Sequence, residues 1–234
     1  MDTIFYCPDI RTNPEMPDTE SQHCARVLRM KEGDPLFITD GKGFFYRAQL
    51  LQANPKSCVV TIEEEIAQQK DWDFNLHIAF APTKSLDRIE WFVEKATEIG
   101  IDAFSPLQCR YSERKNINTA RLEKIMVSAM KQSQKSRLPQ LDELIKFDQF
   151  IKQPFAGQKF IAHCYDSIKT PLTQICKKNT DTLILIGPEG DFSEEEVAKS
   201  IEQGFIPISL GESRLRTETA ALVACHTIQL LNQL

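Results

Sequence analysis

Apolar positions from about residue 74 onward follow two different periods in turn. Short runs of strand length alternate with segments in which apolar residues recur every three or four positions, as on one face of a helix. We expect five strands, at about Asn75 to Ala81, Ala103 to Leu107, Lys159 to Cys164, Leu183 to Ile186 and Ile206 to Leu210. Strands that alternate with helices indicate an α/β fold with a parallel sheet and helices on its faces.

The helices between these strands carry their own end signals. Apolar residues recur at helical spacing from Leu86 to Ile99, and Gly100 would end that helix. Further helices are expected over about Thr119 to Ser136, from about Ser193 to Gly204, and from Thr217 to about Leu231. Ser193 followed by Glu196 is a capping box. The last helix is apolar around much of its circumference, so it must be buried in its own core or against a second subunit.

The chain from Ile4 to about Glu65 has the pattern of a small barrel instead. One helical piece is expected at about Glu20 to Met30, and turn signals separate several β-rich runs, at Leu36 to Thr39, Phe44 to Leu51 and Cys58 to Ile62. The polar, charged stretch between Glu63 and Asp71 is the best candidate linker. It predicts two domains, residues 1–70 and residues 74–234.

Composition is ordinary for a globular protein, with 41% hydrophobic and 26% charged residues. There is no apolar run of about 18 residues and no basic, apolar leader, so we expect neither membrane insertion nor export. The seven cysteines are scattered without a CxxC pair, which is typical of reduced thiols in the cytoplasm. Histidine spacings typical of metal ligands are absent, so no metal site is expected.

Two strand ends near the C-terminus each lead into a turn that could bind a ligand. The run Leu183 to Ile186 leads into Gly187-Pro188-Glu189-Gly190-Asp191-Phe192, and the run Ile206 to Leu210 leads into Gly211-Glu212-Ser213-Arg214-Leu215-Arg216. Loops at the carboxyl ends of adjacent parallel strands line one crevice where ligands bind. His163 ends another predicted strand and should face the same crevice, although a structural histidine is the default interpretation.

Charge narrows the class of ligand. Glu189, Asp191 and the three glutamates from Glu194 to Glu196 crowd the first turn, and no GxxxxGK[ST] lysine is present. A polyphosphate would be repelled there, whereas a ligand that is neutral or cationic at its reactive end is easier to place.

The segments GPEGDF and LGESRLRTETAA resemble the C-terminal signature of the RsmE family of ribosomal RNA methyltransferases, with Asp191 where the family usually has glycine. The resemblance implies the SPOUT class, with a trefoil knot that holds S-adenosylmethionine, and a homodimer. The implied reaction is methylation of N3 of one uridine in 16S ribosomal RNA. The cofactor-binding positions that it implies are Leu185, Gly187, Glu189, Gly190, Leu210, Gly211 and Leu215.

A basic stretch indicates a second type of contact, although the whole chain has a net charge of −5. Between Arg110 and Arg137 there are eight cations and two anions, a footprint that suits a phosphate backbone, although a solvated helix face would also account for it. Near the N-terminus, HCARVLRMKEGD resembles the PUA-like domain of the same family, which helps to hold RNA. Our candidate RNA-binding residues are Arg26, Arg29, Arg110, Lys131, Lys135 and Arg137.

The chemistry requires removal of the proton on uracil N3 and stabilisation of the resulting anion. We hypothesise that Arg114 and Arg216 supply the cations, and Glu218 is a weak candidate for the base. Two other interpretations remain open: a non-catalytic RNA-binding factor for ribosome assembly, and an enzyme of the same fold that acts on transfer RNA.

Overall fold

The computed structural model describes residues 3–166 and 168–234, and the chain forms two compact units. The first unit contains the residues up to Asp71 together with Val127–Leu138. The second contains Trp72–Met126 and Pro139–Leu234. The segment Val127–Leu138 therefore belongs with the first unit. The predicted domains, residues 1–70 and 74–234, were contiguous and did not separate this segment from the second domain.

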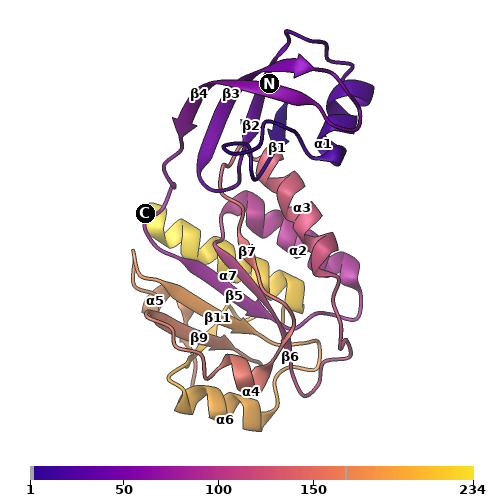
Figure 1. Ribbon diagram of the computed structural model, residues 1–234. Helices are drawn as coiled ribbons and strands as arrows, with labels where there is room; N and C mark the ends of the chain where they lie inside the picture. The colour runs from indigo at the N-terminus through magenta and orange to yellow at the C-terminus, as the bar shows by residue number, and fades with distance from the viewer. Residues whose placement is uncertain (1–2, 167) are drawn as a thin grey trace. The chain divides into compact units, whose positions relative to one another are not determined.

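The first unit is built on a four-stranded sheet in the order β1-β2-β3-β4 (Figure 1). Its strands are β1 (Ile4–Tyr6), β2 (Pro35–Thr39), β3 (Phe44–Gln52) and β4 (Val59–Ala67). The first pair is parallel and the other two pairs are antiparallel. The segment after β1 reaches the free edge of β4, where the Met16 amide donates to the Cys58 carbonyl at 2.8 Å. The sheet therefore curls toward closure around its own core.

The predicted helical piece at Glu20 to Met30 divides into two turns of different type. These are α1 (Asp18–Gln22) and the π-helix η1 (His23–Val27). The chain then leaves the helix through Arg29, whose φ is +55°. A left-handed residue stops helical hydrogen bonding, so the helical segment ends before Met30.

Backbone hydrogen bonds and the ion pair of Lys131 with Glu20 join the added segment Val127–Leu138 to the rest of the first unit. The Ser136 carbonyl accepts from the Gly43 amide at 2.9 Å, and the Leu138 amide donates to the Gly41 carbonyl at 2.9 Å. Lys131 Nζ lies 2.7 Å from Glu20 Oε1, and both side chains are largely buried. This segment includes the last part of helix α3 (Thr119–Gln132).

The second unit contains a parallel sheet in the order β10-β12-β9-β11-β5-β6-β7, and β8 also pairs with β6. Its central strands are β5 (Leu76–Phe80), β6 (Ala103–Gln108), β9 (Gln158–Ala162), β11 (Thr182–Ile186) and β12 (Ile206–Ser209). The edge strands are β7 (Gln140–Leu141), β8 (Ile145–Lys146) and β10 (Thr170–Pro171). All these pairs are parallel, which confirms the predicted α/β class.

The strand order differs from the expectation in one respect that shapes the site. The strands β11 and β12, whose exits were expected to be adjacent, are separated by β9, which pairs with both. The loop that follows β9 therefore lies between the other two exits. The order of the strands along the sequence does not predict this arrangement, because β9 comes before β11 and β12 in the chain and yet lies between them in the sheet.

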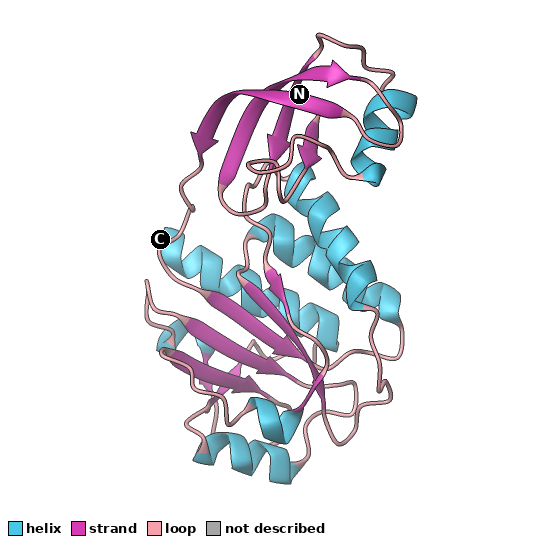
Figure 2. Ribbon diagram, in the orientation of Figure 1, coloured by secondary structure: helices cyan, strands magenta, loops and turns pink. Residues whose placement is uncertain are grey.

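Helices cover both faces of this sheet (Figures 1 and 2). On one face α2 (Leu86–Ile99) packs against α7 (Thr217–Gln233), and α7 contacts β5 and β11. Helix α5 (Leu172–Ile175) also contacts α7. On the other face of the sheet lie α4 (Phe147–Phe150) and α6 (Glu194–Glu202). Helix α7 buries Ala221, Ala224, Cys225 and Ile228 within its own chain, so its apolar character is largely explained by this core.

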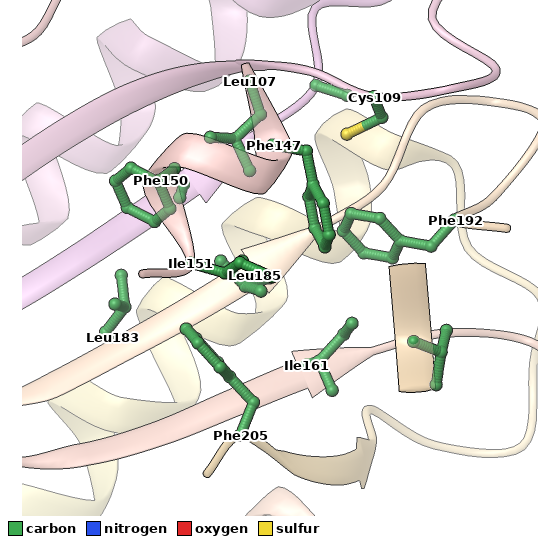
Figure 3. Close-up of a cluster of buried hydrophobic side chains, with 13 residues drawn as sticks. Leu107, Cys109, Phe147, Phe150, Ile151, Ile161, Leu183, Leu185, Phe192 and Phe205 are labelled. Carbon is green, nitrogen blue, oxygen red and sulfur yellow. The ribbon is translucent and has the colours of Figure 1, made fainter. Parts of the chain in front are cut away.

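The core under α4 and α6 determines where the first turn of the site lies. Phe192, which follows β11, is fully buried and its ring centroid lies 5.4 Å from that of Phe147 (Figure 3). The same cluster contains alternate strand residues, Ala79, Ile161, Leu183 and Leu185. Phe192 therefore anchors the turn to the sheet through apolar packing.

Among the described residues, no helix combines the length and apolar character that crossing a membrane would require.

Candidate cofactor site

A cavity of about 560 Å³ lies at the carboxyl ends of β9, β11 and β12, which is within the usual size range of small-molecule sites. Three loops and the start of α7 line it. The lining residues are Ala162 to Tyr165, Lys169, Ile186 to Asp191, Ile208 to Leu215, Thr217 and Ala220. The two loops selected from the sequence thus meet in one cavity, and the exit of β9 supplies a third wall.

The first loop, Gly187 to Phe192, follows β11 and is held by a tight turn and by helix α6, which comes after it. The Asp191 amide donates to the Pro188 carbonyl at 2.9 Å, which closes the turn. Ser193 and Glu196 form the predicted capping box, so the start of α6 is fixed as well. A side chain at Gly187 would place its Cβ 3.1 Å from the Phe192 ring, so only glycine fits without displacement.

Asp191, at the position where the sequence resemblance implies glycine, adopts the backbone conformation that glycine favours. Its φ is +65°, a left-handed value that aspartate tolerates better than most residues. Its carboxylate accepts hydrogen bonds from two backbone amides, from Cys164 at 2.7 Å and from Phe192 at 2.7 Å. The bond to Cys164 ties the exit of β11 to the exit of β9, so the substitution adds a link that glycine could not provide.

The second loop is joined to the first through the start of α7. Thr217 is buried, and its Oγ1 donates to the Gly187 carbonyl at 3.0 Å. Ser209 Oγ accepts from the Gly211 amide at 3.2 Å and donates to the Gly211 carbonyl at 3.0 Å. Gly211 has a φ of +126°, which an L side chain rarely adopts. The bond from Thr217 joins the two loops, and the bonds of Ser209 fix the conformation of the second loop.

His163 is the buried polar group of the cavity that sequence analysis noted but assigned no role. The side chain is 8% exposed, and its Nδ1 has no hydrogen-bond partner within the described part of the chain. Burial and the nearby Lys169 lower its pKa, and Asp191 opposes them. Lys169 Nζ donates to the His163 and Tyr165 carbonyls at 3.0 and 2.8 Å. A bound ligand could pair with the unsatisfied ring nitrogen, since buried polar groups rarely remain without a partner.

The charges around the cavity suit a ligand with a cationic centre. Its lining includes the carboxylates Glu189, Asp191 and Glu212 and the cations Lys169 and Arg214. Lys169 is already bonded to backbone carbonyls, which reduces its capacity to bind a phosphate. Mixed charges with a small acidic excess are consistent with the sulfonium, ammonium and carboxylate groups of S-adenosylmethionine.

Six of the seven predicted cofactor-binding residues line this cavity: Gly187, Glu189, Gly190, Leu210, Gly211 and Leu215. Leu185 does not, because it is fully buried in the core. It pairs with Ala79 of β5 on one side and with Ile161 of β9 on the other. Its side chain and backbone are therefore both committed to the sheet. The residues of the β9 exit, Cys164 and Tyr165, were not predicted, although the same rule of strand ends could have identified them.

The three candidate catalytic residues have different surroundings. Arg114 Nε donates to the Lys84 carbonyl at 2.9 Å, and the Lys84 amide donates to Glu189 Oε1 at 2.9 Å, so Arg114 is linked to the first loop. Arg216 is exposed at the N-cap of α7, next to the second loop. Glu218 is 7% exposed, lies 3.8 Å from Arg88 Nε, and does not line the cavity.

The candidate RNA-binding residues divide between the two units, as the predicted basic stretch itself does. Arg26 and Arg29 are exposed in the first unit, where Arg137 Nη1 also donates to the Lys42 carbonyl at 3.3 Å. Lys135 belongs to the same unit. Lys131 is committed to its ion pair with Glu20, which leaves it poorly placed to meet a phosphate. Arg110, in the second unit, is exposed and lies 3.3 Å from Glu195.

Comparison with known proteins identifies relatives along almost the whole chain. Residues 70–229 match the sequence model of a family described as RNA methyltransferase domain, and residues 17–63 match that of an RNA methyltransferase PUA domain. Ribosomal RNA small subunit methyltransferase E of Bacillus subtilis (strain 168) is 28% identical over 228 residues, which cover 92% of this chain and 89% of that protein.

Solved structures agree with these relatives. The crystal structure of a probable rRNA-methyltransferase from Porphyromonas gingivalis has a TM-score of 0.93 and 44% identity, and the match covers 99% of this chain and 98% of that one. A putative methyltransferase from Legionella pneumophila, in complex with the bound cofactor SAM, has a TM-score of 0.88 and 27% identity, with 98% of each chain covered. The resemblance carried by GPEGDF and LGESRLRTETAA is confirmed, and this chain belongs to the RNA methyltransferase family that includes ribosomal RNA small subunit methyltransferase E.

Proposed function

We propose that this protein transfers a methyl group from S-adenosylmethionine to N3 of a specific uridine in 16S ribosomal RNA. The observation that carries the proposal is the cavity at the exits of β9, β11 and β12, found in a chain of the RNA methyltransferase family. Relatives named ribosomal RNA small subunit methyltransferase E support the choice of RNA, and neighbours crystallised with SAM support the choice of cofactor.

Within the cavity, we assign the cofactor to the backbone groups of Gly187, Gly190, Gly211 and Leu215, with Leu210 beside them. The fixed turns at both loops present these amides and carbonyls without further ordering, which lowers the entropic cost of binding. The Nδ1 of His163, which has no hydrogen-bond partner among residues 3–166 and 168–234, is available for a polar group of the cofactor. When bound, S-adenosylmethionine supplies an activated methyl group on its sulfonium.

The acceptor end of the reaction depends on positioning and on charge. N3 of neutral uracil holds a proton, and its removal leaves an anion spread over the ring nitrogen and the two carbonyl oxygens. We assign Arg114 and Arg216 to stabilise that anion, by the same logic as an oxyanion hole. Glu218 is less suited to act as the base, because its side chain is buried and lies close to Arg88.

The first unit, with its PUA domain match, is proposed to hold RNA through Arg26, Arg29, Lys135 and Arg137. Ribosomal RNA within the small subunit, in the cytoplasm, is the proposed partner. These cations would contact phosphates and so add affinity without selecting the sequence.

Two finer structural features belong to the same proposal: a trefoil knot in the C-terminal segment and a homodimer. Two observations support a C-terminal segment that is threaded through the rest of the fold. The Thr217 hydroxyl donates a hydrogen bond to the Gly187 carbonyl, and strand β9 lies between β11 and β12 in the sheet. Leu230 and Leu234 are 43% and 82% exposed and offer apolar surface to a second copy. Mechanical stretching tests the knot, because a knotted chain extends less than its contour length, and light scattering tests the dimer.

The decisive experiment is incubation with labelled S-adenosylmethionine and small ribosomal subunits that lack the modification, with the product nucleoside identified by mass. We expect N3-methyluridine. If the protein binds the cofactor and methylates transfer RNA but not the subunits, its substrate is transfer RNA. Failure to bind the cofactor in calorimetry, with RNA binding retained, would instead identify a non-catalytic assembly factor.

A further inference from the structure

An exposed aromatic side chain lies beside the first loop of the cavity. Tyr111, in the loop that follows β6, is 48% exposed. A Cβ built at Gly190 would lie 3.1 Å from the Cβ of Tyr111, so the two residues are in direct contact. Gly190 lines the cavity and Tyr111 does not, so Tyr111 lies in a second layer, directly against the cavity wall. The absence of a side chain at Gly190 is what allows this close approach.

The backbone that carries Tyr111 is held on both sides. The Cys109 amide donates to Ser112 Oγ at 3.0 Å, and the Ser112 amide donates to the Cys109 carbonyl at 3.2 Å. The Arg110 amide donates to Glu196 Oε1 at 2.8 Å, and Glu196 is the N3 residue of the capping box that begins α6. Tyr111 therefore projects from a fixed turn, which reduces the loss of conformational entropy when a ligand binds to its ring.

Cations accompany this ring. The Arg110 guanidinium carbon lies 6.0 Å from the centroid of the Tyr111 ring. Arg114, two residues beyond Ser112, is linked through Lys84 to Glu189 of the cavity. The loop beside the cavity wall therefore combines an exposed aromatic ring with positive charges, the combination by which proteins bind unpaired nucleotides through base stacking and phosphate contact.

We propose that Tyr111 is the stacking platform for the target nucleotide, which binds with its base against the phenol ring and its phosphate near Arg110. This inference rests on the proposed function. A base in a helix must leave its stack before its N3 can be reached, and it then loses the stacking energy of its neighbours. An exposed aromatic ring next to the cavity wall would restore part of that energy close to the proposed cofactor site.

The test compares four variants in steady-state methyl transfer to unmodified small subunits. Replacement of the ring by a side chain without a π system, in Tyr111→Leu and Tyr111→Ala, should lower kcat/KM for the RNA by about 5-fold to 100-fold. Tyr111→Phe and Tyr111→Trp should stay within about threefold of the wild type, because stacking needs the ring and not the hydroxyl. The Kd for S-adenosylmethionine, from calorimetry, should change by less than about twofold in all four.

A matched control is Trp91→Ala, which removes another exposed aromatic side chain, 43% exposed on α2. It should leave kcat/KM nearly unchanged. If Tyr111→Leu matches the wild type, or if Tyr111→Phe is as impaired as Tyr111→Leu, the stacking role is wrong. A parallel loss of cofactor affinity in the Tyr111 variants would also overturn it, since Tyr111 would then serve only to pack the loop at Gly190.

The proposed function and this inference fail in different ways. A wild-type protein that binds no S-adenosylmethionine or methylates no subunit RNA contradicts the proposed function and the stacking role together. A wild-type protein that is active, with a Tyr111→Leu variant of equal activity, contradicts only the stacking role.

Discussion

The carboxylate of Asp191 accepts a hydrogen bond from the backbone amide of Cys164 at 2.7 Å, and so joins two strand exits that are 27 residues apart in the chain. Asp191 also has a left-handed backbone, with φ of +65°. This residue therefore combines two opposing contributions: a backbone conformation that is costly for an L side chain, and a side chain that links the walls of the cavity.

Replacement of Asp191 should separate these contributions. Asp191→Ala loses the two hydrogen bonds and keeps the costly backbone, so we expect a loss of about 1–3 kcal/mol in the free energy of unfolding. Asp191→Gly also loses the bonds but relaxes the backbone, so it should lose less. Urea denaturation measures both. Equal losses in the two variants would show that the left-handed conformation carries no cost at this position.

Removal of the hydroxyl of Thr217 should loosen the contact between the two cavity loops. Thr217→Val keeps the shape but leaves the buried Gly187 carbonyl without its donor, which should cost about 1–3 kcal/mol and weaken binding of S-adenosylmethionine. Thr217→Ser retains the hydroxyl and is the control. Thermal unfolding with and without cofactor gives both quantities, and a valine variant that behaves like the serine variant would contradict this role.

Removal of the Arg114 guanidinium should affect turnover far more than cofactor binding. Arg114 is assigned to stabilise charge on the uracil anion and does not line the cofactor cavity. Arg114→Ala should lower kcat by about 100-fold, the usual scale for loss of one such group, while the Kd for S-adenosylmethionine stays nearly constant. Arg114→Lys, which keeps the charge, should retain part of the activity. Equal losses in kcat and cofactor affinity would reject the assignment.

The stability of the protein should fall as the medium becomes acidic, with His163 as one contributor. Burial and Lys169 lower the pKa of folded His163 below the value of about 6.5 expected in an unfolded chain. The unfolded chain then binds the proton first, so the stabilisation is present above about pH 6.5 and is lost as the pH falls through the folded pKa. His77 is shifted in the same direction by burial.

The check is the pH dependence of urea denaturation between pH 7 and about pH 5. His163→Gln cannot titrate, so its stability should decline less steeply over this range than that of the wild type. Cofactor affinity of the wild type should also weaken on acidification, because a protonated His163 would repel the cationic cofactor. Identical profiles for the two proteins would exclude His163 from both effects.

Much of the fold could be predicted because its signals are local. The apolar runs of β11 and β12, the helical spacing of α2 and the capping box at Ser193 each depend on residues that are close in sequence. The same local signals located both turns of the cavity, and motif resemblance added the cofactor and the type of reaction. Six of the seven cofactor-binding residues that the resemblance implied lie in the lining of the cavity.

The tertiary structure alone decided which distant segments meet. The position of β9 between β11 and β12, the pairing of Lys131 with Glu20, and the contact of Tyr111 with Gly190 all join residues far apart in the chain. The interaction energies of these contacts depend on strand order and on burial, and neither can be read from the local spacing of apolar residues. The sequence by itself therefore determined the elements and the two binding turns, whereas long-range packing decided what completes the cavity and which charges remain available to RNA.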